Sequence, residues 1–220
     1  MIRVIVDYDG TITDRNTFDA LARSKMDPEE WRLMEQALDM AELPLRDSLA
    51  RKASFVRMSL VQADLYLQER VRFDPTFPEF VRLCTKLAIP VSVVSAGPAP
   101  LIRAALKRHG LAELPVVAND VEIDESGHWR MVFKNAVPNG IDKVEQVRLH
   151  QNASGRVVYF GDSHSDFEAA LAADLRYAKT GLGLERFLQN RSVPYMAFSQ
   201  FSEIDPSQFL VGPAIRPQPA

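Results

Sequence analysis

Two aspartates, Asp7 and Asp9, stand two positions apart and are the first residues in the chain whose spacing could do chemistry. They follow the apolar run 2–6 and precede a Gly-Thr pair. Because residues i and i+2 of an extended segment point to the same face, the two carboxylates would repel each other and resist desolvation. A divalent cation or a proton-transfer role would each make this arrangement worthwhile.

A second acidic motif follows a later apolar run, in the segment VVYFGDSHSDFEAA. We expect Asp162 at the tip of a strand and Asp166 in the first turn of the next helix, near the positive end of its dipole. An N-cap role for Asp162 or Ser163 explains one acidic residue equally well. It does not explain three acids on one rim, whereas an oxygen-rich cluster suits Mg²⁺ and leaves coordination free for a phosphate oxygen.

A third polar site follows the apolar start of the segment VSVVSAGPAP. Ser95 is expected at the end of a strand, with Ala96 and Gly97 directly after it. A hydroxyl and free backbone N–H groups near a helix start can hold a small anion. A capping serine in an ordinary strand-to-helix turn explains the same residues.

The elements that must position these residues change character along the chain. After the first strand, helical spacing continues to about residue 72 without a strand candidate. From Asp74 onward helices and strands alternate, with strands predicted at 90–95, 114–120, 156–162, 175–180 and 194–198 and a hairpin at 120–135. Alternation of this kind predicts an α/β fold with a doubly wound parallel sheet, whose ligands bind at the carboxyl ends of the strands.

The change from helices alone to alternating helices and strands predicts two domains. Residues 1–14 and 74–210 are predicted to form the α/β core domain, and residues 15–73 a helical-bundle cap inserted into it. The proline-rich stretch 211–220 is expected to be a flexible tail.

Composition narrows the partners and the compartment. Hydrophobic residues make up 46% and charged residues 25%, and 26 basic against 29 acidic residues give a net charge of −3. This is ordinary for a soluble globular protein, and no basic block indicates nucleic acid. No apolar stretch approaches the roughly 20 residues of a membrane span. The single cysteine, Cys84, excludes an intrachain disulfide and favours a cytoplasmic location.

The order of the motifs, DYDGT, then VVSAG, then a lysine, then GDSHSD, resembles the haloacid dehalogenase superfamily of phosphatases. The resemblance implies a Rossmann-like core and a Mg²⁺-dependent phosphomonoesterase that hydrolyses a small phosphorylated metabolite through an aspartyl phosphate. It implies that Asp7 is the nucleophile and that Asp9 is the general acid and then the base. Mg²⁺ would be held by the carboxylates of Asp7 and Asp162 and by the backbone carbonyl of Asp9.

The resemblance assigns roles to further residues. Thr11 orders the loop of the first motif, and Ser95, Ala96 and Gly97 form the phosphate-binding segment. Lys134 and Lys143 both lie in the interval where the family has its lysine. Lys143 is preferred, because it starts the helix leading into the Asp162 strand. Asp166 would orient this lysine or a metal-bound water.

The helical insertion resembles the cap shared by phosphoserine phosphatases and their relatives. Within this branch the segments DYDGTIT, DPEEW and VPYMAFSQFSEI are most similar to 2-hydroxy-3-keto-5-methylthiopentenyl-1-phosphate phosphatases. Arg46, Arg51 and Lys52 are candidate substrate ligands in the cap, although such charges usually form a solvated face. Arg51 is preferred because a guanidinium can bind a carboxylate or phosphate bidentately.

Other readings stay open at this point. Phosphoserine phosphatase or another small-molecule phosphatase of the same branch is the enzymatic alternative. A phospho-switch or a binding protein that has lost catalysis is the non-enzymatic one. We expect no nucleic-acid or membrane partner, and either a monomer or a homodimer.

Overall fold

The computed structural model describes residues 1–40, 42–153 and 155–211. The strands of this part of the chain are β1 (Ile2–Val6), β2 (Val91–Pro98), β3 (Val116–Ile123), β4 (Trp129–Val132), β5 (Arg156–Gly161), β6 (Leu175–Lys179) and β7 (Met196–Phe198). They form one sheet in the order β4-β3-β2-β1-β5-β6-β7. β1 pairs in parallel with β2 and β5, and β6 pairs in parallel with β5 and β7, whereas β3 and β4 are antiparallel. The predicted fold class is confirmed.

The central strands are apolar because both of their faces are covered. Val4, Ile5 and Val6 of β1 are fully buried, and β5 is buried from Val157 onward. Near-continuous apolar runs of this kind are typical of parallel sheets packed between helices. Val6 is in register with Phe160 on one side, so the residue that follows each strand emerges at the same edge of the sheet.

The chain divides into two compact units, each described here by itself. Unit 1 comprises Met1–Ile12, Asp74–Val94 and Lys143–Ala220, and unit 2 comprises Thr13–Phe73 and Ser95–Asp142. The boundaries predicted from the sequence, with a core at 1–14 and 74–210 and a cap at 15–73, stay a prediction. The predicted tail, apart from Val211, lies outside the described residues.

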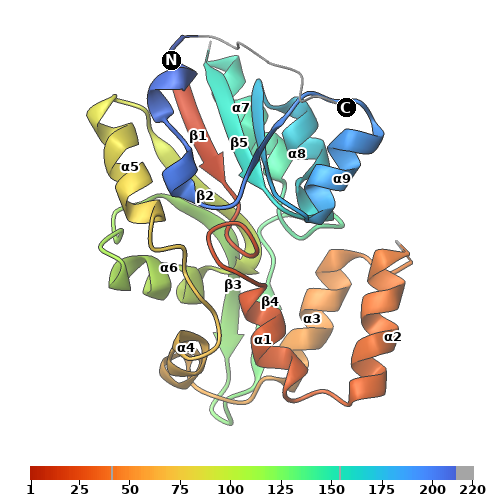
Figure 1. Cartoon of the computed structure of the whole chain (residues 1–220). Helices are drawn as coiled ribbons and strands as arrows, with labels where there is room; N and C mark the ends of the chain where they lie inside the picture. The colour runs from red at the N-terminus through yellow and green to blue at the C-terminus, as the bar shows by residue number, and fades with distance from the viewer. Residues whose placement is uncertain (41, 154, 212–220) are drawn as a thin grey trace. The chain divides into compact units, whose positions relative to one another are not determined.

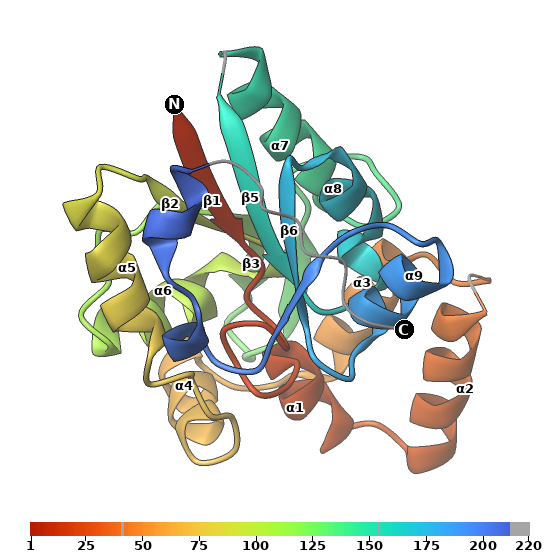
Figure 2. The ribbon, with the colours of Figure 1, turned by 45° about the horizontal axis from the view of Figure 1, so that its top comes forward.

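Unit 1 contains β1, the first half of β2, β5, β6 and β7 together with four α-helices: α5 (Phe77–Lys86), α7 (Lys143–Asn152), α8 (Phe167–Ala172) and α9 (Gly183–Asn190). Figures 1 and 2 show α5 to one side of β1 and β5, and α7 and α8 to the other. Short 3₁₀ helices follow at His164–Asp166, Phe201–Glu203 and Pro206–Phe209. Packing of aromatic rings between β5, β7 and α5 centres on Phe160, whose ring lies 5.6 Å from Phe80 and 5.4 Å from Phe198.

Unit 2 contains α1 (Thr17–Arg23), α2 (Pro28–Asp39), α3 (Leu45–Phe55), α4 (Leu60–Gln68) and α6 (Ala99–Arg108), with the β3–β4 hairpin. Two helix starts agree with the sequence pattern: Asp27 accepts hydrogen bonds from the Glu29 and Glu30 amides, and Ser59 and Gln62 form a capping box. Helix α1 lies within the stretch predicted to be helical, but its bounds were not predicted, because seven residues give too little periodicity to recognise.

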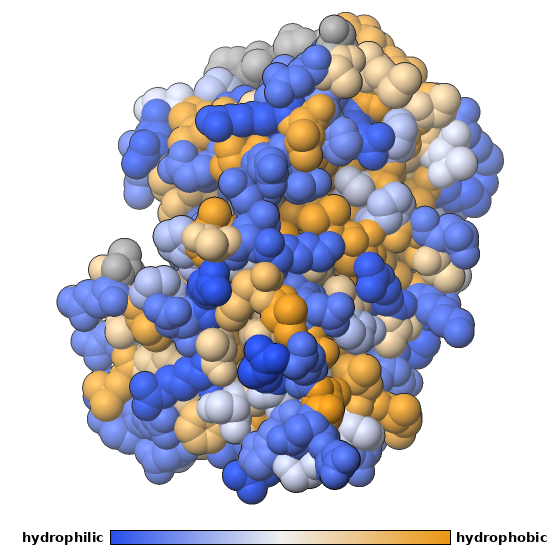
Figure 3. Space-filling model, turned by 180° about the vertical axis from the view of Figure 1, so that it is seen from behind, coloured by the Kyte–Doolittle hydropathy of each residue, from blue (hydrophilic) through white to orange (hydrophobic). Residues whose placement is uncertain are grey.

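The molecular surface mixes polar and apolar side chains. The exposed large apolar residues are spread over several helices and both termini, among them Leu33, Leu65, Leu149 and Val211. Figure 3 shows hydrophilic and hydrophobic residues interspersed on the face seen from behind. Among the residues that the structure describes, no helix is long and apolar enough to cross a membrane.

Candidate active site

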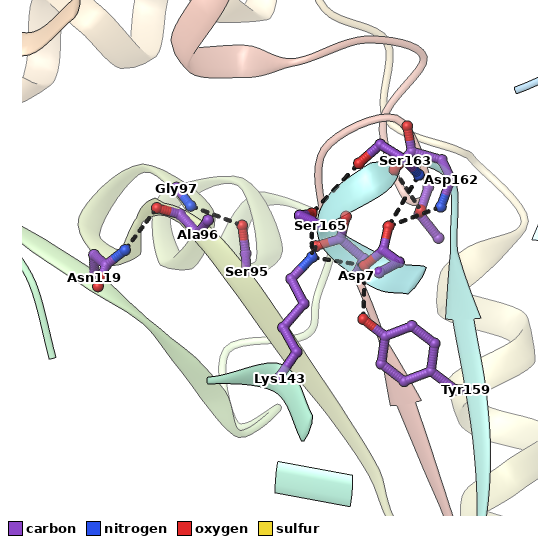
Figure 4. A network of polar contacts seen from close by, with 12 residues as sticks. Asp7, Ser95, Ala96, Gly97, Asn119, Lys143, Tyr159, Asp162, Ser163 and Ser165 are labelled. Atoms are coloured by element: carbon purple, nitrogen blue, oxygen red, sulfur yellow. Dashed lines mark hydrogen bonds and ion pairs between the residues drawn. The ribbon is translucent and has the colours of Figure 1, made fainter. Parts of the chain in front are cut away.

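Asp7 directly follows β1, begins the first motif and belongs to unit 1. Its amide donates to the Phe160 carbonyl at 2.9 Å, which extends the strand pairing by one residue and fixes the backbone there. Its side chain is 5% exposed, and its Oδ1 lies 2.9 Å from Nζ of Lys143. The carboxylate is therefore held in a buried ion pair at the carboxyl end of a central strand (Figure 4).

Lys143 is the first residue of α7 and is buried beneath the acidic residues. Its ammonium donates to Asp166 Oδ1 at 2.7 Å and to Ser165 Oγ at 3.0 Å, in addition to the Asp7 contact. Burying a lysine is costly unless its donors find partners. Here three donors meet three acceptors, so the ammonium is held in one position.

Asp166 is fully buried and uses both carboxylate oxygens. Oδ1 accepts from Lys143 and from the Tyr159 hydroxyl at 2.6 Å, and Oδ2 accepts from the amides of Asp162 and Ser163 at 3.0 Å each. A Cβ on Gly161 would lie 2.6 Å from Cγ of Asp166, so a glycine is required before the turn. Asp166 therefore fixes the lysine and the turn that carries Asp162.

Asp162 follows β5 and lies against the loop of the first motif. Its Oδ1 accepts from the Thr11 hydroxyl at 3.4 Å. A Cβ on Gly10 would lie 2.2 Å from Asp162 Oδ2, and Gly10 has a φ of +75°. Glycine is needed there for both reasons, because a side chain would collide with the carboxylate and the backbone lies in the left-handed region.

The electrostatics of the cluster separate its carboxylates. Burial, and then the charge of Asp166, raises the pKa of Asp7 from 3.8 to about 7, although Lys143 opposes the shift. Burial with the charges of Asp166 and Asp7 raises the pKa of Asp162 well above its usual value. Burial also acts to raise the pKa of Asp166, but Lys143 and the hydrogen bonds to this carboxylate outweigh it, so this pKa is lowered.

These residues fit a divalent cation. One carboxylate oxygen from each of Asp7, Asp162 and Asp166 lies within 4.8 Å of the other two, and the donor set is all oxygen, as Mg²⁺ prefers. Two of the three carboxylates resist ionisation in the protein alone, and an added cation would relieve this. Because Asp166 already accepts four hydrogen bonds, Asp7 and Asp162 are the better placed ligands.

Ser95, Ala96 and Gly97 belong to unit 2 and lie inside β2 rather than after it. The strand was expected to end at residue 95, but it continues to Pro98. The Gly97 amide donates to Ser95 Oγ at 3.0 Å, and the side-chain amide of Asn119 donates to the Ala96 carbonyl at 2.8 Å. These three residues are buried and held by their own hydrogen bonds (Figure 4), and their role in phosphate binding stays a prediction.

Other predicted residues lie in different surroundings. Lys134 is exposed in unit 2, and Arg51 is exposed with its guanidinium on Glu30 at 2.6 Å. Asp9 is half-buried and has contacts of its own. Cys84 is fully buried, and burial raises the pKa of its thiol to about 12, so it is not a nucleophile. The roles assigned to Arg51 and Asp9 stay predictions.

Two residues of the cluster were not identified from the sequence. Tyr159 stands within the apolar run of β5, where a tyrosine is typical of a core, and Ser165 stands in a polar turn. No spacing rule connects them to Asp7 or to Lys143. The contact of Tyr159 joins β5 to the 3₁₀ helix at His164–Asp166, and the contact of Ser165 joins this short helix to α7.

The family profile of the haloacid dehalogenase-like hydrolases matches residues 4–171, which include every acidic residue of the cluster. The chain belongs to the haloacid dehalogenase-like hydrolases. This confirms the family predicted from the sequence and the prediction of a hydrolytic enzyme.

Curated relatives are similar to this chain over most of its length, and a solved structure is similar to it in fold. The chain is 28% identical over 222 residues to polyol phosphate phosphatase PYP1 of Saccharomyces cerevisiae, covering 93% of this chain and 92% of that one. It is 24% identical over 206 residues to a 2-hydroxy-3-keto-5-methylthiopentenyl-1-phosphate phosphatase of Brevibacillus brevis, covering 90% of each. A substrate-bound phosphoserine phosphatase structure is similar in fold, with a TM-score of 0.71 at 16% identity, covering 96% of this chain and 98% of that one.

Proposed function

We propose that this hydrolase is a Mg²⁺-dependent phosphomonoesterase that forms an aspartyl phosphate on Asp7. The supporting observation is the buried pair of Asp7 and Lys143, with Asp162 in the same acidic cluster. An isolated ion pair of this burial contributes little to stability. The pair of Asp7 and Lys143 instead suits a nucleophile, because the ammonium keeps the attacking carboxylate in place beside the position of a phosphate ester.

The chemistry divides between the two aspartates of the first motif. In the first step an oxygen of Asp7 attacks phosphorus, the ester P–O bond breaks, and the leaving alcohol takes a proton from Asp9. In the second step water loses a proton to Asp9 while its oxygen attacks phosphorus, which releases phosphate and restores the Asp7 carboxylate. Two adjacent carboxylates can thus have separate roles, one ionised and one carrying the proton.

The other residues of the cluster act on charge and position. Lys143 lies beside Asp7, where its ammonium stabilises negative charge that moves to the phosphoryl oxygens during attack. Asp166 holds this lysine through a second ion pair. Asp7, Asp162 and the Asp9 carbonyl would hold Mg²⁺, which would supply positive charge against the phosphate oxygens.

The substrate is proposed to be a small phosphorylated metabolite, with two candidates. The sequence segments noted above favour 2-hydroxy-3-keto-5-methylthiopentenyl-1-phosphate, and the relative from Saccharomyces cerevisiae favours a polyol phosphate. Unit 2 contains a cavity of about 690 Å³, lined in part by Arg15, Arg23, Trp31, Glu35, Tyr66 and Arg70. A cavity of that size has room for a small metabolite.

The charges of this cavity bear on the choice of substrate. Arg15 pairs with Asp14 at 3.1 Å, and Arg70 pairs with Glu69 at 2.9 Å. These two guanidinium groups already have acidic partners, whereas Arg23 of the same lining lies over the Trp31 ring, 6.0 Å from its centre. The lining therefore suits an uncharged chain as well as a carboxylate, and phosphoserine stays the alternative substrate. A cytoplasmic location and a monomer or homodimer remain predictions from the sequence.

The test is phosphate release from a panel of phosphomonoesters, with Mg²⁺ or with chelator. The panel contains polyol phosphates, the methylthiopentenyl phosphate, sugar phosphates and phosphoserine. We expect Mg²⁺-dependent turnover by the wild type and a loss of at least about 10³-fold in Asp7→Asn. Asp205→Asn is the matched control, because it removes an exposed carboxylate that only caps a short helix.

Two results would contradict the proposal. Turnover that survives Asp7→Asn excludes this residue as the nucleophile. A folded wild type that binds Mg²⁺ but hydrolyses nothing in the panel would favour a phospho-switch or a binding protein.

A further inference from the structure

Lys179 is the last residue of β6 and is half-buried beside the loop of the first motif. Its ammonium donates to the backbone carbonyl of Thr11 at 3.0 Å. It also lies 5.0 Å from the centre of the Phe198 ring and 5.9 Å from that of Phe201. A lysine connecting a central strand to the nucleophile loop has no role in the chemistry described above.

The carbonyl that Lys179 binds lies at a sensitive point of the loop. The amides of Thr11 and Ile12 both donate to the Tyr8 carbonyl, which closes the turn that follows Asp7. The Thr11 hydroxyl donates to Asp162, so the same residue reaches the acidic cluster with its side chain. The hydrogen bond from Lys179 to the Thr11 carbonyl therefore restrains both the turn and the Thr11 hydroxyl.

The two aromatic rings explain why the lysine stays in place. Phe198 and Phe201 are almost fully buried and belong to the closing segment VPYMAFSQFSEI, which the sequence analysis singled out. Cation–π contacts with two rings favour the ammonium at this position. The Phe201 amide donates to Asp74, and the Asp74 amide donates to the Ile12 carbonyl, so the closing segment is tied to the end of the same loop.

The charge of Lys179 is also useful at this place. Burial lowers its pKa, and the nearby charges of Asp74, Asp162 and Glu203 act in the opposite direction. A positive charge close to Asp162 offsets part of the repulsion within the acidic cluster.

We propose that Lys179 is a positioning residue, which holds the loop from Asp7 to Thr11 in its reactive geometry while Phe198 and Phe201 hold the lysine. The proposal rests on the proposed function, because the loop carries the nucleophile and the general acid. The contacts of Lys179 are with the backbone of this loop and with the two aromatic rings. Its contribution is to reduce the number of conformations of the loop, and small misplacements of reacting groups can cost about 10²-fold in rate.

The experiment compares three variants. Lys179→Met removes the donor and the charge but keeps an unbranched stem against the rings, and Lys179→Arg restores both donor and charge. Arg176→Met is the matched control: Arg176 lies on the same strand, is half-buried, and donates to a backbone carbonyl, that of Ala173, at 2.7 Å. It removes the same kind of contact away from the nucleophile loop.

Each variant is measured by kcat and KM on the best substrate and by hydrogen–deuterium exchange of a peptide covering residues 4–13. For Lys179→Met we expect kcat to fall about 10- to 100-fold with KM changed less than threefold, and faster exchange in that peptide. Lys179→Arg should recover most of kcat. Arg176→Met should change neither kcat nor the exchange of that peptide.

Two results would overturn the proposal: unchanged kcat and exchange in Lys179→Met, or equal losses in Lys179→Met and Arg176→Met. The exchange measurement separates this proposal from the proposed function. If the wild type hydrolyses nothing, faster exchange in Lys179→Met alone still supports the positioning role, and unchanged exchange refutes it.

Discussion

Each of the two units contains a buried lysine between two carboxylates. The two sites differ in the exposure of these carboxylates to solvent. In unit 1 Lys143 lies 2.9 Å from Asp7 and 2.7 Å from Asp166. In unit 2 Lys52 lies 2.6 Å from Asp19 and 2.9 Å from Glu35. Both lysines are 2–3% exposed, but the acids of Lys143 are 0–5% exposed, whereas those of Lys52 are 26% and 33% exposed.

This difference in hydration decides what each site can do. The acids of Lys52 keep part of their water, so the lysine is neutralised at a moderate cost, and its ammonium also lies 4.9 Å from the centre of the Trp31 ring. Around Lys143 the acids have lost their water, and Asp162 adds a further negative charge. Such a cluster is poorly suited to stabilising a fold and well suited to binding a cation and attacking an ester.

The largest expected effect comes from Lys143→Met. Removing this ammonium leaves Asp7 and Asp166 buried without a counter-charge, so we expect kcat to fall by about 10³-fold and the free energy of unfolding by about 3–5 kcal/mol. Steady-state kinetics and urea unfolding measure the two effects. Lys143→Arg keeps the charge and should fold, yet still lose most of kcat, since the guanidinium cannot keep all three contacts.

If Lys143→Arg retained the activity of the wild type, the exact geometry of the Asp7–Lys143 pair would not be needed for catalysis. The lysine would then contribute only its positive charge. If Lys52→Met lost as much kcat as Lys143→Met, the contrast between the two lysines would fail.

The second prediction concerns pH in metal-free protein. Asp7 has a folded pKa of about 7, above its ordinary 3.8, so between these values the unfolded chain releases a proton that the folded chain keeps. The contribution of Asp7 to the free energy of unfolding should therefore fall as pH rises from about 4 to about 7 and level off above that range. Urea unfolding in chelator at pH 5, 6, 7 and 8 measures this slope, and Asp7→Asn should reduce it.

The pH dependence of Mg²⁺ binding is a second test of the raised pKa of Asp7. Because the cation competes with a proton on Asp7, the affinity of the protein for Mg²⁺ should increase up to about pH 7. The stabilisation of the protein by Mg²⁺ should be larger at pH 8 than at pH 5. A pH-independent affinity, measured by calorimetry, would show that Asp7 is ionised throughout this range.

The sequence was informative where a residue type has few alternatives. Two aspartates after an apolar run predicted the strand end and the acidic cluster, because parallel strands end at one edge of the sheet. Lys143 was preferred over Lys134 from its place at the start of a helix, and the structure places Lys143 in the cluster.

Tertiary contacts account for what the sequence did not reveal. Tyr159 reads as a core residue until its hydroxyl is seen on Asp166, and Lys179 reads as a solvated strand end until its ammonium is seen on the Thr11 carbonyl. The end of β2 was placed too early, because Ser95 and Gly97 resemble turn residues although they continue the strand. Local propensity cannot identify such positions, since the partner strand and buried hydrogen bonds determine them.

The third prediction is Lys52→Met. The methionine fills the space of the lysine stem, but Asp19 and Glu35 lose their counter-charge. Because both acids remain partly hydrated, we expect a loss of about 1–3 kcal/mol, less than for Lys143→Met. Thermal unfolding measures it, and Glu35→Gln should be milder, since Asp19 would still pair with the lysine. A loss as large as that of Lys143→Met would mean that hydration of the acids does not separate the two sites.

The smallest expected effect on stability is that of Arg51→Ala. Its pair with Glu30 is exposed, and exposed pairs contribute about 0–1 kcal/mol, so the unfolding midpoint should hardly move. Steady-state kinetics test whether the Arg51 guanidinium binds the substrate, as the sequence predicted. A rise in KM of at least about tenfold with constant kcat would support that grip, with Arg32→Ala as the control, since Arg32 pairs with Glu29 on α2 in the same exposed manner. Equal and small changes in both variants would assign Arg51 to the solvated face of α3, and substrate selection would then have to come from other residues, such as those of the unit 2 cavity.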